Sequence, residues 1–353
     1  MSSDNPRIDR PTTIRDLANA TGLSVSTISN YLNGKPVRRE NRPLIEDAIR
    51  TLGYTRNETA REVRLGCSDI VGIVVSNLNI DYVRQVALLL QENLENNGYT
   101  PVIYDCRSDA AIEQRTVERI VRRNVSGIIS LPTDPDSVSY HHAAERRLPL
   151  VLLSSSDSSV SASHVTISDE YALGQMFTAL LEAGHKRIGV IAAAVEFELM
   201  QKRTDVFCKL LHACFPDSDR SLLYTDDRIS VNVGYTGALR LMAAPVPPTA
   251  IVCLSRDIFI GARLALCEHG FCIPEQVSLC GIELDYNMNS DMTMDYDVIL
   301  QPVQLLAQRA TDFLCEAIQM RSGDAPLNQQ NLEILAKYRS GHSIAPPFKG
   351  KPV

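Results

Sequence analysis

Small hydrogen-bonding side chains are spaced along one face of a predicted helix near the N-terminus. They are Ser26, Thr27, Ser29 and Asn30, and Val25 precedes them. A solvated helix face commonly carries Glu and Lys, whereas hydroxyls and carboxamides can bond to the base edges and phosphates of DNA. These residues therefore favour a DNA-reading surface, and a small helical bundle that binds no ligand is the alternative.

Three short helices are expected to position that surface within residues 12–53. Thr13 and Asp16 have the spacing of a capping box, with Asp in place of the usual Glu. Gly22 allows the positive φ of a tight turn, and Ser24 is a suitable N-cap for the second helix. Two helices joined by a short turn containing glycine are typical of a helix-turn-helix, whose second helix enters the major groove.

The net charge of −7 is divided unevenly along the chain. Residues 1–66 contain 11 Lys and Arg against 8 Asp and Glu, whereas the remaining residues contain 24 against 34. The basic excess therefore lies where a surface that contacts phosphates would need it. Residues 55–67 form a polar, Arg-bearing stretch, which we interpret as a hinge, with a plain linker as the alternative.

From residue 68 the pattern changes to apolar runs of strand length separated by helical stretches. The expected strands are 70–75, 101–104, 127–131 and 150–153, followed by 187–191, 249–253 and 277–280. Continuous apolar runs that alternate with helices predict doubly wound parallel sheets. The Ser-rich segment 154–163 separates the two groups of strands. We expect it to cross between two α/β subdomains with a ligand cleft between them, although a surface loop is the alternative.

Motifs of enzyme, cofactor and metal chemistry are absent from the sequence. There is no G-x-G-x-x-G, P-loop, H-E-x-x-H or G-x-S-x-G motif. The nine cysteines include no C-x-x-C pair, which favours reduced thiols in a cytosolic protein over a zinc site. No apolar run reaches the roughly 18 residues of a membrane span, and the polar N-terminus does not look like a signal peptide. We therefore expect a cytoplasmic protein with no cofactor, no metal, no membrane association and no enzymatic activity.

Several sequence blocks resemble the LacI/GalR (lactose-repressor) family of transcription regulators. The blocks are TIRDLA at 13–18, GLSVSTIS at 22–29, LNG at 32–34, LGY at 52–54, GHKRIG at 184–189 and PEQVS at 274–278. The resemblance covers the chain from about residue 12 to residue 343. It implies a small all-α helix-turn-helix head joined to an α/β core that resembles periplasmic sugar-binding proteins, with two doubly wound parallel-sheet subdomains.

The resemblance also implies how the chain is divided and what it does. The expected parts are a disordered N-terminus (1–11), the head (12–54), the hinge (55–67), the effector-binding and dimerisation core (68–343) and a tail (344–353). The expected protein is a homodimeric repressor that binds an operator in double-stranded DNA and responds to a sugar or sugar phosphate in the cleft. A cytosolic solute-binding protein or sensor with the same core is the alternative, but it leaves residues 12–66 without a purpose.

Residues that contact DNA are carried over from the family position by position. Val25, Ser26 and Asn30 match base-reading positions; Thr27, Ser29, Asn33 and Tyr54 match phosphate-contacting positions; and Asn57, Arg61 and Val63 belong to the hinge. The family usually has Arg where Asn30 stands. Because Arg suits guanine and Asn suits adenine, we expect an operator that depends less on guanine there. Val63 stands where the family usually has a Leu that inserts between base steps in the minor groove. Because Val is one methylene shorter, its burial contributes about 0.8 kcal/mol less, and we expect weaker kinking of the DNA.

Residues that contact the effector are carried over in the same way. They are Asn77, Tyr82, Arg203, Ser255 and Glu283. Arg203 and Glu283 fit the bidentate polar groups that a sugar site needs, and a structural ion pair between the two is the alternative. Glu283 stands where the family has Asp, and Arg256 replaces the Asp that commonly follows the position of Ser255. Because so many cleft positions differ, the family's usual effectors are not expected to transfer to this chain.

Overall fold

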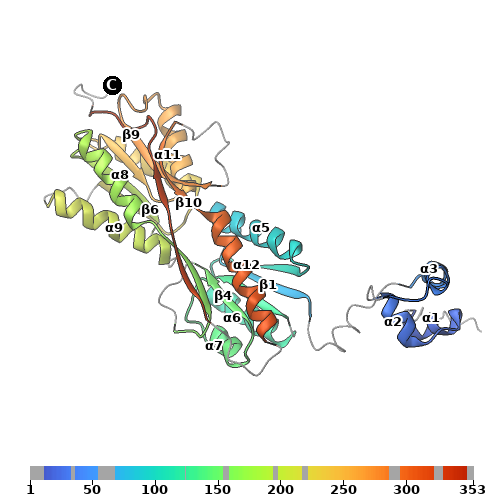
Figure 1. The fold of residues 1–353 in the computed structure, drawn as a ribbon. Coiled ribbons are helices and arrows are strands. Elements are labelled where there is room, and N and C mark those ends of the chain that lie inside the picture. Colours follow the sequence, from blue (N-terminus) through green and yellow to red (C-terminus); the bar gives the residue numbers. More distant parts are fainter. Residues whose placement is uncertain are drawn as a thin grey trace, which may run out of the picture. The chain divides into compact units, whose positions relative to one another are not determined.

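The computed structural model describes most of the chain in two compact units. The described residues are 12–32, 36–54, 68–123, 125–153, 159–193, 198–216, 222–285, 295–321 and 329–347. The units are Met1–Ser68, which contains the head, and Asp69–Val353, the core (Figure 1). The segments 1–11 and 55–67, which we expect to be a disordered N-terminus and a hinge, lie outside the described residues. No helix in the described part is long and apolar enough to cross a membrane.

The head consists of α1 (Ile14–Thr21), α2 (Val25–Leu32) and α3 (Asn41–Thr51). The predicted capping box is confirmed, since Thr13 and Asp16 bond to each other's backbone N–H groups. Gly22 ends α1 with φ of 69°, the left-handed conformation that a side chain would disfavour. One side chain from each helix, Leu17, Ile28 and Ile45, is completely buried between the three. The apolar face of α2 is thereby fixed inward, and its polar face is turned outward.

The N-terminal lobe of the core is a parallel sheet with strand order β11-β5-β4-β3-β1-β2. Its strands are β1 (Ile70–Val75), β2 (Thr100–Asp105), β3 (Gly127–Leu131), β4 (Leu150–Leu153), β5 (Ser163–Ser168) and β11 (Asn331–Leu335). Its helices are α5 (Asp81–Asn96), α6 (Ala110–Arg122), α7 (Val138–Glu145) and α12 (Val303–Met320). Helices α5 and α12 lie side by side in Figure 1.

The C-terminal lobe repeats this arrangement with strand order β12-β10-β9-β8-β6-β7. Its strands are β6 (Ile188–Ala193), β7 (Leu223–Asp226), β8 (Ala250–Cys253), β9 (Ser278–Leu284), β10 (Asp297–Gln301) and the antiparallel edge strand β12 (Lys337–Arg339). Its helices are α8 (Glu170–Glu182), α9 (Glu198–Cys214), α10 (Val231–Met242) and α11 (Arg256–Glu268). The expected pair of parallel-sheet subdomains is confirmed, with β12 as an antiparallel addition.

The chain crosses between the lobes later than the sequence pattern predicts. The strand β5, which follows the Ser-rich segment, pairs with β4 and β11 and so remains in the N-terminal lobe. The first crossing therefore comes at Asp169, between β5 and α8, and not within 154–163. The prediction was wrong because β5 has no continuous apolar run and is held in the N-terminal lobe by its pairing with β4 and with the distant β11.

Two glycines fix the position of α11, whose N-terminus carries Ser255, Arg256 and Asp257. A Cβ on Gly261 would lie 1.8 Å from the carbonyl oxygen of Val231 in α10, and a Cβ on Gly234 would lie 1.9 Å from that of Ile258 in α11. The two helices can approach this closely only because both residues lack a side chain. The approach therefore holds the start of α11 in place.

Candidate DNA-reading helix and effector cleft

The outward face of α2 carries uncharged hydrogen-bonding groups. Ser26 and Asn30 are exposed, Thr27 is half-buried, and Val25 is 41% exposed. Ser24 organises this face, because its Oγ accepts a bond from the backbone N–H of Thr27 at 3.2 Å and lies 2.8 Å from the hydroxyls of both Ser26 and Thr27. Helix α2 contains no charged residue. Its face can therefore offer hydroxyl, carboxamide and methyl groups to a base edge, but no guanidinium.

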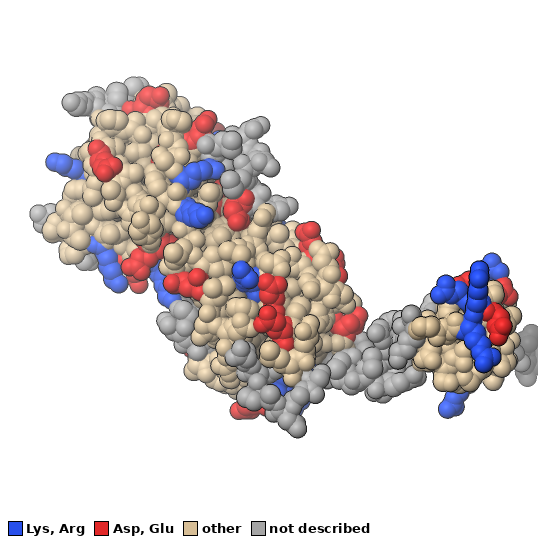
Figure 2. Space-filling model, viewed as in Figure 1, with Lys and Arg blue, Asp and Glu red and all other residues tan. Residues whose placement is uncertain are grey.

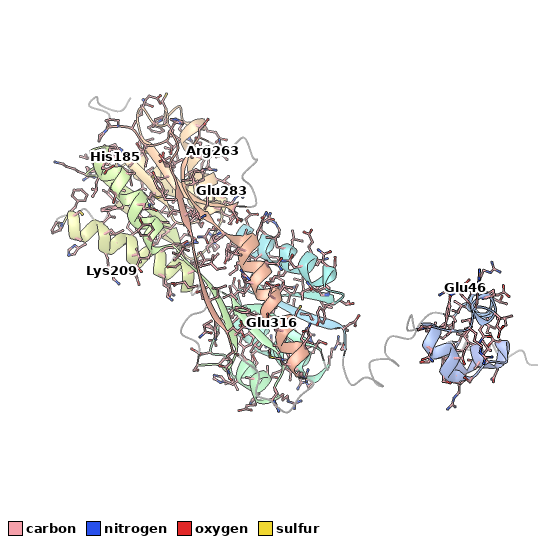
Figure 3. The ribbon with its side chains drawn as sticks, in the orientation of Figure 1. Glu46, His185, Lys209, Arg263, Glu283 and Glu316 are labelled. Atoms are coloured by element: carbon pink, nitrogen blue, oxygen red, sulfur yellow. The ribbon has the colours of Figure 1, made fainter. Side chains whose placement is uncertain are left out.

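Helix α3 holds α2 from behind. The Tyr31 hydroxyl of α2 donates to Glu46 Oε1 of α3 at 2.7 Å, and this bond raises the pKa of Tyr31. Glu46 is labelled in Figure 3. Figure 2 shows Lys and Arg side chains on the visible face of the head. The described arginines of the head are Arg15, Arg38, Arg39, Arg42 and Arg50. These cations suit contacts with phosphates, which orient a head on DNA without reading its sequence.

The other predicted DNA contacts divide into two groups. Tyr54 is half-buried and packs against the small core of the head, with its backbone N–H donating to the carbonyl of Ile49 at 3.0 Å. Asn33, Asn57, Arg61 and Val63 lie outside the described residues. The structure therefore places Val25, Ser26, Thr27, Ser29 and Asn30 together on α2 and Tyr54 at the end of the head.

The cleft between the lobes of the core is narrow. Its cavity measures about 20 Å³. It is lined by Ile80 and Tyr82 from the N-terminal lobe and by Met200, Arg203, Ile229, Ser255, Arg256, Asp257, Ile282, Leu284 and Gln301 from the C-terminal lobe. A cavity of this size holds about one water molecule. A sugar ring does not fit in this cavity, whereas a hollow of about 330 Å³ lined by β5, α8 and α9 also includes Arg203.

Arg203 is held at the crossing between the lobes. Its Nε donates to Asp169 Oδ2 at 2.6 Å and its Nη1 donates to the carbonyl of Leu254 at 3.1 Å, while the Gln301 amide also donates to Asp169. Arg203 and Asp169 are both about 95% buried. Three buried polar atoms here, Arg203 Nη2, Gln301 Oε1 and Glu283 Oε2, have no hydrogen-bond partner among the described residues. Such atoms cost free energy unless a ligand or ordered water satisfies them.

Glu283 is bonded to Arg256 and not to Arg203. Arg256 Nε donates to Glu283 Oε1 at 2.5 Å, and Arg256 Nη1 donates to Asp81 Oδ2 at 2.7 Å. Glu283, labelled in Figure 3, is completely buried on β9. The ion pair between Arg203 and Glu283, which the sequence leaves open as an alternative, is therefore wrong. Each of the two residues has a different partner of opposite charge.

Asp81 also meets the start of α11. Its backbone N–H donates to Asp257 Oδ2 at 3.2 Å, and its carboxylate binds Arg84 one turn along α5. Burial, and then the nearby charge of Asp81, raises the pKa of Asp257. The N-terminus of α5 and the N-terminus of α11 are thus joined by charged and polar contacts.

The structure brings most of the predicted effector residues together. Tyr82, Arg203 and Ser255 line the cavity, and Glu283 joins it through Arg256. The Ser255 hydroxyl also caps α11 by accepting from the N–H of Ile258 at 3.3 Å. Asn77 is not among the lining residues, and its side chain bonds to Ser108 and to the N–H of Asn79.

Four acidic or amide residues at the cleft were missed from the sequence: Asp81, Asp169, Asp257 and Gln301. Asp169 follows β5, Gln301 is the last residue of β10, and Asp81 is the first residue of the helix that follows β1. Ligands of parallel α/β sheets bind beyond the carboxyl ends of the strands. A search for polar residues after each predicted strand could have found Asp81 and Asp257, which follow β1 and β8, but not Asp169 and Gln301, because β5 and β10 were not predicted.

Two protein-family models match the chain along most of its length. The model described as bacterial regulatory proteins, lacI family, matches residues 13–57. The model described as periplasmic binding proteins and sugar binding domain of LacI family matches residues 68–297. The chain belongs to the LacI family. It is a transcriptional regulator with a DNA-binding helix-turn-helix head and a core of the sugar-binding type.

Relatives of this LacI-family chain match both parts. The transcriptional regulator reg1 of Streptomyces lividans is 27% identical over 97% of this chain and 99% of its own. The transcriptional repressor PurR of Actinobacillus pleuropneumoniae serotype 3 is 24% identical over 87% of this chain and 91% of its own.

Solved structures share the fold of this LacI-family chain. The Lac repressor dimer bound to operator and the anti-inducer ONPF matches 95% of this chain and 100% of its own, with a TM-score of 0.80 and 21% identity. The regulator CelR in complex with cellobiose matches 95% of this chain and 100% of its own, with a TM-score of 0.66 and 22% identity.

Proposed function

We propose that this LacI-family regulator acts in the cytoplasm as a homodimeric repressor, without enzymatic activity, and that a small sugar-like effector between the lobes sets its affinity for an operator. The observation that carries the proposal is the outward, uncharged face of α2 on a head joined to a two-lobed core. The repressor PurR, the cellobiose complex of CelR and the operator-bound Lac repressor dimer support it by similarity. The proposed division is head 12–54, hinge 55–67 and core 68–343.

The proposed DNA contacts are of two kinds. Val25, Ser26 and Asn30 read base edges from α2, which their exposure supports. Thr27, Ser29, Asn33 and Tyr54 contact phosphates, and Asn57, Arg61 and Val63 contact DNA from the hinge. Because no guanidinium is present on α2, we expect the half-site to be read through adenine and thymine at the position of Asn30.

The proposed effector contacts are Tyr82, Arg203, Ser255 and Glu283, with Asn77 in the loop that leads into α5. Their support is that three of the five line one cavity between the lobes and that a fourth, Glu283, is bonded to the lining residue Arg256. The homodimer is proposed because two heads on one palindromic operator are the usual solution for a helix-turn-helix reader.

Selection of binding sites from random duplex DNA by the full chain tests this proposal. We expect an enriched site of two inverted half-sites, with an A·T pair at a position that Asn30→Ala no longer selects. A matched control, Arg115→Gln on the exposed face of α6, should select the same site as the unaltered chain. Failure of the correctly folded chain to enrich any sequence would refute the regulator and favour a solute-binding protein.

A further inference from the structure

One guanidinium of the C-terminal lobe reaches across the cleft. Arg256 and Glu283 belong to α11 and β9 of that lobe, whereas Asp81 opens α5 of the N-terminal lobe. The bond from Arg256 Nη1 to Asp81 Oδ2 at 2.7 Å therefore ties the two lobes, between residues 175 apart in sequence. The bond from the Asp81 N–H to Asp257 at 3.2 Å ties the same two helix starts. The Asp81 and Glu283 side chains are 5% and 1% exposed, and that of Arg256 is 20% exposed.

These contacts join the two lobes across the cleft. Its cavity of about 20 Å³ admits no effector, yet the lobes are already in contact. Two-lobed proteins close around a ligand that contacts both lobes. In this chain Arg256 makes the contacts to both lobes that such a ligand would make.

We propose that Arg256 is an internal ligand of the cleft, which holds the lobes together and which an effector must displace from Asp81 and Glu283. The proposal rests on the proposed function only in placing the effector at this cleft. Because the open state is then the one that binds, its population sets the apparent affinity for the effector. Removal of Arg256 raises that population and opens the cleft.

The same contacts define the chemical class of the effector. A group that replaces Arg256 must donate hydrogen bonds to two carboxylates, and the partnerless Glu283 Oε2 and Gln301 Oε1 are also acceptors. Arg203 Nη2 is the single buried donor without a partner among the described side chains of the cleft. A phosphate or carboxylate offers only acceptors, and it would meet four carboxylates, Asp81, Asp169, Asp257 and Glu283. An uncharged polyhydroxyl ligand supplies the donors, so the structure favours a neutral sugar over a sugar phosphate.

The lack of tryptophan in the chain allows a direct test of closure. Tyr82→Trp places a single fluorophore in the wall of the cleft, where Tyr82 is 8% exposed. We expect acrylamide to quench it weakly in the full chain and several-fold more strongly when Arg256→Gln is added. The same change at an exposed position, Arg115→Gln, should leave quenching unaltered. Equal quenching in the Arg256→Gln and Arg115→Gln proteins would overturn the proposal.

A second variant keeps the test decisive if Arg256→Gln does not fold. Asp81→Asn removes the carboxylate in the N-terminal lobe and leaves the pair of Arg256 with Glu283 intact within its own lobe, and it should raise quenching as well. Unchanged quenching in folded Asp81→Asn would contradict the tie between the lobes. Neither measurement uses operator or effector, so either result is independent of whether the chain represses transcription.

Inorganic phosphate tests the chemical class. In the chain carrying both Asp81→Asn and Glu283→Gln, Arg256 has lost both carboxylates and becomes available to an anion. We expect phosphate to raise the melting temperature of this double variant and to leave that of the unaltered chain nearly unchanged. A rise no greater in the double variant than in the unaltered chain would refute the proposal, because any phosphate that binds the arginines of the head contributes equally to both proteins.

Discussion

The head and the cleft of this regulator use polar side chains in opposite ways. On α2, Ser26 and Asn30 are exposed and no charged residue is present. In the cleft, Arg203 and Arg256 are buried or half-buried and are bonded to carboxylates of the same chain. The two regions are thus arranged differently for binding a ligand. The head presents its hydrogen-bonding groups to solvent, whereas the cleft stores them in internal pairs that a ligand must replace.

The largest effect is expected from breaking the buried pair at the lobe crossing. Arg203→Ala leaves the Asp169 carboxylate buried with only the Gln301 amide as a side-chain partner. Removing one partner of a buried ion pair costs about 3–5 kcal/mol of unfolding free energy. Urea titration of the full chain measures it. Arg50→Ala, which removes the exposed pair of Arg50 with Asp47 in the head, is the matched control and should cost little. Equal losses in the two variants would contradict the comparison.

A slightly smaller loss is expected where α10 and α11 touch. Gly261→Ala would place a Cβ 1.8 Å from the carbonyl oxygen of Val231, so the helix that carries Arg256 must shift. Overpacking against backbone costs about 3 kcal/mol. Gly174→Ala in α8 is the control, because no atom lies within 4 Å of the added Cβ and the stability should hold or rise. The account of the fixed α11 start would be wrong if thermal melting ranked the two variants alike.

In the head, Asn30 should affect specificity without affecting stability. Asn30→Ala removes an exposed side chain, so the melting temperature should not change, while discrimination for adenine should fall by about 1–3 kcal/mol. Asn30→Arg should move the preferred base at that position towards guanine. Competition binding with single-base operator variants measures both effects. If both Asn30→Ala and Asn30→Arg kept the base preference of the unaltered chain, Asn30 would not read a base.

The smallest effect is a pH dependence that belongs to the core alone. His185, labelled in Figure 3, is buried with its ring nitrogens 2.9 Å from the Thr249 hydroxyl and 3.0 Å from that of Ser278. Burial lowers the pKa of His185 below its ordinary value of 6.5. The folded state therefore prefers the neutral ring, and its contribution to stability is full above pH 6.5 and declines as the pH falls towards the lowered pKa.

His185→Gln should remove that decline, because glutamine does not titrate. Unfolding free energies measured in urea at several pH values between 5 and 8 compare the two proteins. The sequence before residue 141 contains no histidine, so a decline in this range does not come from a histidine of the head. If the unfolding free energies of the two proteins fell in parallel as the pH decreased, His185 would not be the cause of the decline.

Local sequence patterns predicted the parts of the molecule that depend on near neighbours. The capping box of Thr13 and Asp16 spans three residues, and the apolar runs that became β1, β3 and β8 are each buried by their own composition. The strand β5 was not predicted because it has no continuous apolar run and because it pairs with β11, whose residues follow it by more than 160 positions. For the same reason, the observed crossing between the lobes at Asp169 comes later than the predicted one within residues 154–163.

The cleft shows the same limit at the level of single residues. The sequence identified Arg203, Glu283 and Arg256 as unusual or functional, but it could not assign their partners. Arg203 bonds to a residue 34 positions away and Arg256 to one 175 positions away. No local rule of spacing relates such pairs. In the head, by contrast, the position of Asn30 on α2 followed from helical periodicity alone.

The central claim is that this chain reads a specific DNA sequence. The ratio of its affinities for the selected operator and for scrambled DNA of equal length and at one salt concentration tests this most directly. We predict a preference of about a thousandfold or more for the operator, with the affinity falling steeply as salt rises. Equal affinities for the two DNAs, measured with folded full-length protein, would contradict the account.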